Sequence, residues 1–197
     1  IDVERQGIDM LSLSGHKIYG PKGVGAIYVK NRGRALKMTP LIHGGGHQNR
    51  IRSGTLPVPL IVGLGKACQL LHDEYKAVND HISKLTVYMK AKLREALPEV
   101  IFNGHPADRI AGNLHITVPN INSEALLYSL RDCVALSTGS ACTTAAPEPS
   151  HVLLAMGIDK KQIAESVRIG IGRFNTKDEI DSVIARFILE VDSIKHF

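Results

Sequence analysis

The first 76 residues contain too few strands to make a complete sheet, and this shortage constrains the fold more than any other feature. Apolar runs predict short strands over residues 9–13 and 24–29, and a helix begins at Pro57 after a glycine-rich loop. Two or three strands and one helix cannot bury both faces of a sheet. We therefore expect residues 1–76 to be the end of an α/β domain, with further strands supplied by chain before Ile1.

Residues 77–197 have the pattern of a smaller α+β domain. Apolar residues recur there either at helical spacing or in alternation, which predicts helices and half-buried strands respectively. The predicted elements are a helix over 80–97, a strand over 113–118, a helix over 123–130 capped by Ser123, a helix capped by Ser150, a strand over 166–171, and a helix that opens on a capping box of Thr176 and Glu179. No internal repeat divides the chain further.

Composition excludes several classes of protein. Hydrophobic residues make up 44% of the chain and charged residues 22%, which is ordinary for a globular protein and excludes a disordered or low-complexity chain. Apolar runs stay shorter than the roughly 18 residues of a membrane span, so we expect no membrane insertion. The net charge is +5, but the densest basic segment, residues 30–37, has no interleaved aromatic side chains, so we expect no direct contact with nucleic acid. The three cysteines lack C-x-x-C spacing, which argues against a disulfide framework and a cysteine-rich zinc site.

A lysine that follows a predicted strand is the first candidate for chemistry. Ser14, Gly15, His16 and Lys17 come directly after the strand over 9–13, at the start of a glycine-rich turn. A lysine held at a strand end suits Schiff-base chemistry, provided that burial or a nearby cation keeps its amine neutral. Ser14 and His16 would then donate hydrogen bonds to an anionic group of a cofactor. An ordinary surface turn has the same residue pattern, so the spacing alone leaves both interpretations open.

A second glycine-rich segment runs from His43 to His47 and must form a loop. Its glycines resemble an oxyanion-hole loop, but the chain has no G-x-S-x-G nucleophile elbow, so we disfavour a lipase-like function. Arg52, Ser53 and Thr55 follow closely and would suit contacts to a phosphate. A solvated turn explains the same residues equally well.

Residues 137–146 are all small, and this run contains Cys142. A structural cysteine is usually surrounded by large apolar side chains, whereas a cysteine among small residues is expected to be exposed and mobile. We therefore interpret Cys142 as a functional thiol. Cys68 lies on the apolar face of the helix after Pro57, and Cys133 follows a short helix, so we expect both to be packing residues.

Arg168 lies on the opposite face of its predicted strand from the apolar residues Val167 and Ile169. Its neighbours Ser166 and Gly170 are small and leave room for a small ligand, so Arg168 would suit a bidentate contact to a carboxylate. A surface arginine is the alternative. The nine histidines show no metal-binding pair, and we expect no metal site.

Four ordered segments together resemble the cysteine desulfurases of the NifS/IscS type, a class V, fold-type I family that depends on pyridoxal phosphate. The segments are residues 14–23 around Lys17, residues 43–47 with 52–55, residues 140–142 with 148–150, and Arg168 with residues 172–174. They cover only the C-terminal half of that family. The resemblance implies the C-terminal part of a fold-type I large domain over residues 1–76, followed by a small α+β domain over 77–197 that carries the cysteine loop.

The resemblance also implies a role for each candidate residue around the cofactor. Lys17 would bind pyridoxal phosphate covalently and then act as acid and base, while Ser14 and His16 would bind its phosphate. Thr55 would reach the phosphate that is bound by the other subunit of a homodimer.

The same resemblance implies a substrate and a product. Arg168 would hold the carboxylate of L-cysteine, and the Cys142 thiolate would attack the substrate sulfur. The expected products are L-alanine and a persulfide on Cys142, which passes its sulfur to an iron–sulfur scaffold protein or to another acceptor. The expected compartment is the bacterial cytoplasm or the mitochondrion.

Two other functions fit less of the sequence. Another class V enzyme, such as a selenocysteine lyase or an aminotransferase, is one alternative, although an aminotransferase has no use for Cys142 on a mobile loop. A non-catalytic half-protein that docks on a sulfur-accepting scaffold is the other. The chain offers no identified aspartate for the pyridine nitrogen and no side chain for the face of the ring. We therefore expect residues 1–197 alone to be inactive without the missing N-terminal half of the enzyme.

Overall fold

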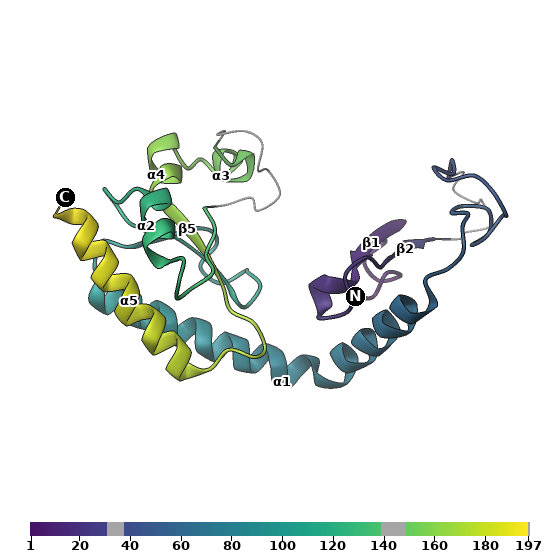
Figure 1. Cartoon of the computed structure of the whole chain (residues 1–197), viewed down its shortest axis with the longest axis horizontal. Coiled ribbons are helices and arrows are strands. Elements are labelled where there is room, and N and C mark those ends of the chain that lie inside the picture. Colours follow the sequence, from purple (N-terminus) through teal and green to yellow (C-terminus); the bar gives the residue numbers. More distant parts are fainter. Residues whose placement is uncertain (31–37, 139–148, 197) are drawn as a thin grey trace. The chain divides into compact units, whose positions relative to one another are not determined.

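The computed structural model describes residues 1–30, 38–138 and 149–196, so Cys142 lies outside the described residues. Contacts divide the chain into two compact units, Ile1–Tyr75 and Lys76–Phe197, whose elements are labelled in Figure 1. Within the described ranges, no helix is both long enough and apolar enough to cross a membrane.

The first unit contains a two-stranded antiparallel sheet of β1 (Met10–Ser14) and β2 (Gly25–Val29). Both strands agree with the predicted strands to within one residue at each end. In the observed register Ser14 pairs with Gly25. A Cβ atom on Gly25 would lie 2.4 Å from the carbonyl oxygen of Leu13, so β2 can begin at this position only with a glycine.

Helix α1 runs without a break from Val58 to Ala96, over 39 residues. The sequence predicted two helices, one from Pro57 and one over 80–97, and this prediction was wrong. The polar segment 72–79 separates the two apolar stripes, but it contains neither glycine nor proline, so nothing in it ends a helix. The boundary between the two units, after Tyr75, therefore lies inside a helix.

The second unit is built on a three-stranded antiparallel sheet in the order β3–β4–β5. The strands are β3 (Ile101–Phe102), β4 (Asn113–Thr117) and β5 (Ser166–Gly170). β4 and β5 agree with the predicted strands. β3 was not predicted, because two residues are too few to show an alternation.

The two faces of this sheet differ in character. Leu114 pairs with Ile169 and Ile116 with Val167, and all four side chains are buried. Successive residues of a strand point to opposite faces, so Arg168 lies on the other, polar face. The alternation that the sequence showed in β4 and β5 thus separates the core from the candidate site.

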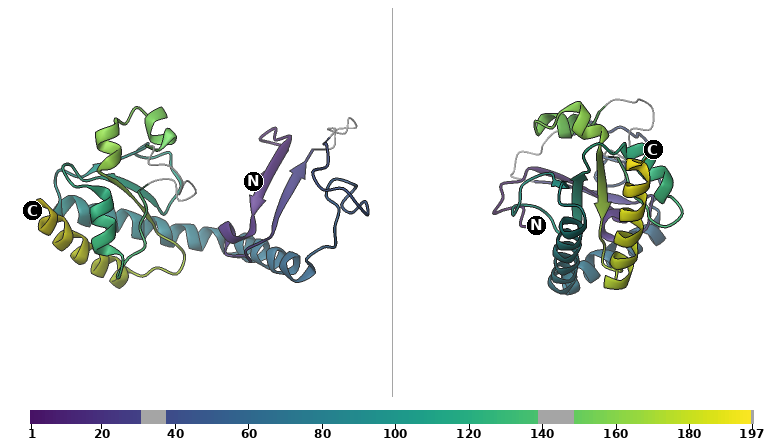
Figure 2. Two further views of the ribbon diagram at one scale, coloured as in Figure 1. Left: turned by 45° about the horizontal axis from the view of Figure 1, so that its top comes forward. Right: turned by 90° about the vertical axis from the view of Figure 1, so that its left-hand side faces the viewer.

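Helices cover the apolar face of the sheet. The C-terminal half of α1 and helix α5 (Lys177–Lys195) lie side by side, as Figure 2 shows, and α2 (Ser123–Leu130) packs against α5. One contiguous core joins these helices to the strands, which holds the second unit together. Its buried members are Leu85, Met89, Leu93, Leu97, Val100, Leu114, Ile116, Val118, Ile121, Leu126, Leu130, Val167, Ile169, Ile171, Ile180, Ile184, Phe187 and Val191.

The longer helices of the second unit begin at polar caps. α5 opens on the predicted capping box, in which the side chains of Thr176 and Glu179 each bond the backbone N–H of the other. α2 is capped by Asn122 rather than by the predicted Ser123. The reason is geometric, because the Asn122 side chain stands one residue before the helix and accepts two backbone N–H groups of its first turn.

Two further helices of the second unit are short. Ser150 stands at the N-cap of α3 (His151–Ala155) as predicted, but its hydroxyl makes no capping hydrogen bond. α4 (Lys160–Ala164), which the Asp159 side chain caps, was not predicted. A helix of five residues is too short for its apolar period to be recognised.

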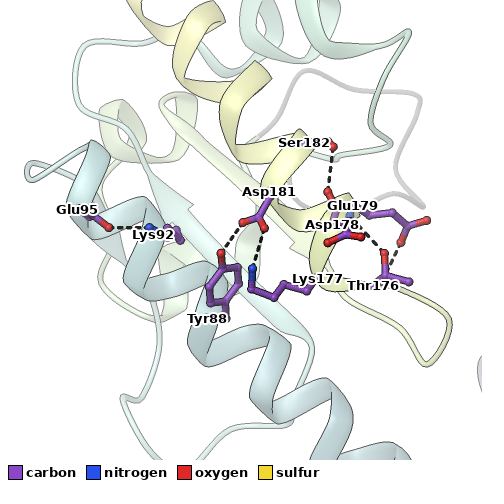
Figure 3. Close-up of polar contacts among 9 residues, drawn as sticks. All are labelled: Tyr88, Lys92, Glu95, Thr176, Lys177, Asp178, Glu179, Asp181 and Ser182. Atoms are coloured by element: carbon purple, nitrogen blue, oxygen red, sulfur yellow. Dashed lines mark hydrogen bonds and ion pairs between the residues drawn. The ribbon is translucent and has the colours of Figure 1, made fainter.

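A polar cluster joins α1 to α5 (Figure 3). The Tyr88 hydroxyl donates to the Asp181 carboxylate at 2.5 Å, and the Lys177 ammonium donates to the same carboxylate at 3.0 Å. The Lys177 nitrogen also lies 4.6 Å from the centre of the Tyr88 ring. The bond from Tyr88, followed by that from Lys177, holds the pKa of Asp181 below its ordinary value. These contacts fix the position of α5 along α1.

Candidate functional site

The backbone holds the Lys17 segment in one conformation. β1 ends at Ser14, a 3-10 turn (η1) covers Gly15–Ile18, and Tyr19 closes this turn in the left-handed conformation with a φ of 62°. The N–H of Gly15 bonds the carbonyl oxygen of Val24 at 2.9 Å. A Cβ atom on Gly15 would lie 3.0 Å from each of two backbone carbonyl oxygens, so any larger residue there would press against the backbone of the turn.

Ser14, His16 and Lys17 come together on this turn, and all three side chains are exposed in the first unit. Ser14 stands at the N-cap position of η1, but its hydroxyl makes no capping hydrogen bond to the backbone of this turn. Capping therefore does not compete with the binding of a ligand by the hydroxyl. A hydroxyl and an imidazole can donate to a phosphate, and a primary amine reacts with an aldehyde. The three groups therefore fit a phosphorylated aldehyde such as pyridoxal phosphate.

Residues 43–47 form the loop that the sequence predicted, and nearby side chains hold it together. Ser53 is buried, and its hydroxyl accepts the N–H of Gly46 at 3.3 Å. The Arg52 guanidinium donates to a backbone carbonyl two residues further on, at 2.9 Å. Arg52 and Ser53 thus support the loop itself, whereas the side chain of Thr55 is exposed.

Arg168 lies on β5 between two buried apolar residues and is itself half-buried. Its backbone pairs with that of Ser137, since the Arg168 N–H donates to the Ser137 carbonyl at 2.7 Å and the Ser137 N–H donates back at 3.3 Å. Its side chain lines a pocket of about 430 Å³, which Ser150 also lines. Ser137 and Ser150 flank the segment that contains Cys142, so both flanks of that segment lie beside Arg168 or its pocket.

The pocket has a positive lining. The described residues around it include the guanidinium groups of Arg109 and Arg168 and no carboxylate. Arg109 is fixed in place, because its guanidinium donates to the carbonyls of Asn103 at 3.2 Å and of Asn113 at 2.6 Å. A positive pocket of this size suits a small anion, such as the carboxylate of an amino acid.

His115 lies beside Arg168 on the polar face, because the two residues pair across β4 and β5. Burial lowers the pKa of His115, and the charges of Arg168 and then Arg109 lower it further. The imidazole is therefore neutral at neutral pH. Sequence reasoning missed this residue, although its alternation with the buried Leu114 and Ile116 places it opposite the core.

The cysteines outside the small-residue run are not packing residues, contrary to the sequence interpretation. Cys68 and Cys133 are both exposed in this chain. On the N-terminal part of α1 the buried residues are Leu64 and Ala67. The buried face of the helix therefore includes Ala67 but not the next residue, Cys68. Cys133 stands in the turn after α2, where its thiol donates to the carbonyl of Leu130 at 3.2 Å. The predicted functional thiol, Cys142, lies outside the described residues.

The chain as a whole matches a known family. The sequence profile of the aminotransferase class-V family matches residues 1–183 of this chain. The chain therefore belongs to this family, whose members depend on pyridoxal phosphate.

Within the family, the chain is similar to cysteine desulfurases. It is 45% identical over 195 residues to the cysteine desulfurase of Rattus norvegicus, covering 99% of this chain and 43% of that protein. It is 42% identical over 195 residues to the cysteine desulfurase IscS of Rickettsia bellii, covering 99% of this chain and 47% of that protein. The X-ray structure of a NifS-like protein from Rickettsia africae matches with a TM-score of 0.86 and 31% identity, over 98% of this chain and 50% of that one. The expected fold-type I class is confirmed, and the chain spans about half the length of these relatives.

Proposed function

We propose that the protein containing this chain is a pyridoxal-phosphate-dependent cysteine desulfurase, which moves sulfur from L-cysteine to one of its own thiols. The observation that carries the proposal is the 45% identity to the rat cysteine desulfurase across 99% of the chain. A match of this length takes in the lysine turn, the arginine pocket and the cysteine segment in one order along the sequence.

The first unit, as the C-terminal part of the large domain, holds the cofactor. Ser14 and His16 would donate to its phosphate, and the Lys17 amine would hold the cofactor covalently and would move a proton at the substrate. Thr55 would donate to the phosphate held by the other subunit of a homodimer. Pyridoxal phosphate, when bound, supplies the electron sink for the reaction. All four side chains are exposed in the first unit and open to a ligand, so the first unit does not itself supply the burial that would keep the Lys17 amine neutral.

The second unit, as the small domain, holds the substrate and accepts its sulfur. Arg168 binds the carboxylate of L-cysteine in the positive pocket. The Cys142 thiolate attacks the substrate sulfur and forms an S–S bond, while the C–S bond breaks and leaves its electron pair on the β-carbon, which takes up a proton. L-Cysteine becomes L-alanine, and Cys142 carries a persulfide. Five residues of extended chain span at most about 18 Å, which sets an upper limit on the distance between Ser137 and Cys142.

The persulfide sulfur then passes to an acceptor, such as an iron–sulfur scaffold protein. The setting we propose is the bacterial cytoplasm or the mitochondrion. A carrier thiol on a different residue from the cofactor lysine suits this role, because the lysine must stay at the cofactor while the sulfur must leave it.

Labelling with ³⁵S-L-cysteine tests the proposal in the protein loaded with pyridoxal phosphate. We expect label on the peptide that contains Cys142, and none in Cys142→Ser, which should also release no sulfide. Cys133→Ser, which removes an exposed thiol elsewhere in the second unit, is the matched control and should label like the wild type. Lys17→Ala should abolish turnover. Label on Cys68 or Cys133, or undiminished sulfide release by Cys142→Ser, would exclude the proposed carrier.

A further inference from the structure

The polar face of the second unit contains a buried chain of hydrogen bonds that runs in one direction. It starts at the backbone carbonyl of Gln162, which can only accept, and to which the Ser166 hydroxyl donates at 2.5 Å. The hydroxyl oxygens of Thr117 and Ser166 are 2.7 Å apart. Because the single hydroxyl hydrogen of Ser166 is already used, Thr117 must be the donor of this second bond. Thr117 is 1% exposed and Ser166 is 0% exposed, so solvent does not reach the pair.

Asn103 continues the chain to His115. Its side-chain nitrogen donates at 2.8 Å to the hydroxyl oxygen of Thr117, whose own hydrogen points to Ser166. The same NH₂ group lies 3.0 Å from Nδ1 of His115. An NH₂ group only donates, so Nδ1 must accept and carries no hydrogen. The neutral ring of His115 therefore has its proton on Nε2.

This Nε2–H group is a donor that the described residues leave unused. It is buried, and none of them accepts a hydrogen bond from it. The ring lines the same pocket as Arg168 and Arg109. Burial, followed by the charges of Arg168 and Arg109, lowers the pKa of His115, so the ring stays neutral, and the bond from Asn103 keeps it in this tautomer. A buried donor without an acceptor is unfavourable, and an anion that enters the pocket would supply the acceptor.

We infer that the Nε2–H group of His115 is a second donor, beside the guanidinium of Arg168, to the carboxylate of the amino-acid substrate. The inference rests on the proposed function, which supplies the amino acid and gives Arg168 its role. The hydrogen-bond chain from Gln162 to Asn103 acts on the substrate only through His115, because it fixes the tautomer of the His115 ring. His115 thus favours ligands with a free carboxylate over their esters and amides.

Substitution of His115 separates binding from chemistry in the protein loaded with pyridoxal phosphate. Phenylalanine keeps a ring but has no nitrogen, so His115→Phe should raise the KM for L-cysteine roughly 10- to 100-fold, as a lost hydrogen bond to a charged group does. Its kcat should change by less than about threefold. His115→Gln, which carries an N–H donor at similar reach, should recover most of the KM. His196→Phe, an exposed histidine outside the pocket, is the matched control and should leave both constants unchanged.

L-Cysteine methyl ester identifies the group that His115 contacts. The ester lacks the charged carboxylate, so the effect of His115→Phe should disappear with this substrate. An unchanged KM of His115→Phe for L-cysteine would overturn the inference and leave the proposed function intact. A protein that releases no sulfide from L-cysteine would overturn the proposed function instead.

The tautomer can be measured without turnover. Two-bond ¹H–¹⁵N correlation spectra of histidine-labelled wild-type protein distinguish the Nε2–H form from the Nδ1–H form. We expect His115 in the Nε2–H form at neutral pH. L-Alanine, which has the same carboxylate and no sulfur, should shift its Nε2 resonance. An Nδ1–H tautomer, or a His115 signal that L-alanine does not move, would overturn the inference even if His115→Phe fails to fold.

Discussion

Replacing Thr117 by valine tests the buried hydrogen-bond chain directly. Valine has nearly the shape of threonine but no hydroxyl, so Asn103 loses the acceptor that lies 2.8 Å from its side-chain nitrogen. The Ser166 hydroxyl loses the donor at 2.7 Å. Asn103 is 9% exposed, Thr117 is 1% exposed and Ser166 is 0% exposed, so water has little access to replace these bonds.

The expected loss of stability follows from which groups are left without partners. Ser166 keeps its own bond to Gln162 and loses only a bond that it accepted. Asn103 keeps a buried N–H with no acceptor, and the penalty for such a group is about 1–3 kcal/mol. We therefore expect Thr117→Val to lower the free energy of unfolding of the second unit by about 1–3 kcal/mol. Amide hydrogen exchange along β4 and β5 measures this quantity for the unit rather than for the whole chain.

A double-mutant cycle with Ser166→Ala completes this test. Replacing both partners of a buried hydrogen bond by apolar groups costs less than the sum of the single replacements. We therefore expect a coupling energy of about 0.5–3 kcal/mol between Thr117 and Ser166. Wild-type exchange rates in Thr117→Val, or strictly additive effects in the double variant, would refute the directional chain.

Four further predictions concern the core, the first sheet and the pocket. Phe187→Ala empties a fully buried core position and should cost about 3–5 kcal/mol in denaturant unfolding. Gly25→Ala places a Cβ atom 2.4 Å from the Leu13 carbonyl oxygen, so it should separate β1 from β2 and speed amide exchange in both strands. The folded-state pKa of His115 lies below its ordinary value of 6.5, so the unfolded state binds more protons as the pH falls through 6.5. The free energy of unfolding should therefore decrease as the pH is lowered through that range, and it should decrease less in His115→Gln. Thermal unfolding measured between about pH 5 and 7 would show the difference. Arg168→Lys keeps the charge but loses the bidentate geometry, so the KM for L-cysteine should rise about tenfold, and an unchanged KM would remove Arg168 from the substrate site.

Elements with a local cause could be predicted from the sequence. The capping box of Thr176 and Glu179 needs only four neighbouring residues, and the alternation of β4 and β5 is complete within each strand. The continuity of α1 was missed, because it depends on the absence of helix-breaking residues in the polar stretch 72–79 rather than on any pattern there.

The candidate site could be predicted only where its residues are neighbours in sequence. Ser14, His16 and Lys17 lie on one turn simply because the chain connects them. The pairing of His115 with Arg168 depends on the register between β4 and β5, which neither strand contains by itself. Whether the thiol of Cys68 on α1 is buried or exposed likewise depends on which stripe of the helix the rest of the unit covers.

The continuous helix α1 has a consequence for how the molecule can be cut. Boundaries between compact units usually lie in exposed linkers, where proteases find an extended backbone. Here the boundary after Tyr75 lies inside a helix, so a protease would first have to unwind α1 around the bond that it cleaves. Limited digestion should therefore spare this junction. A gene split after Tyr75 would give two fragments with severed helix ends, each with four backbone groups that have lost their partners.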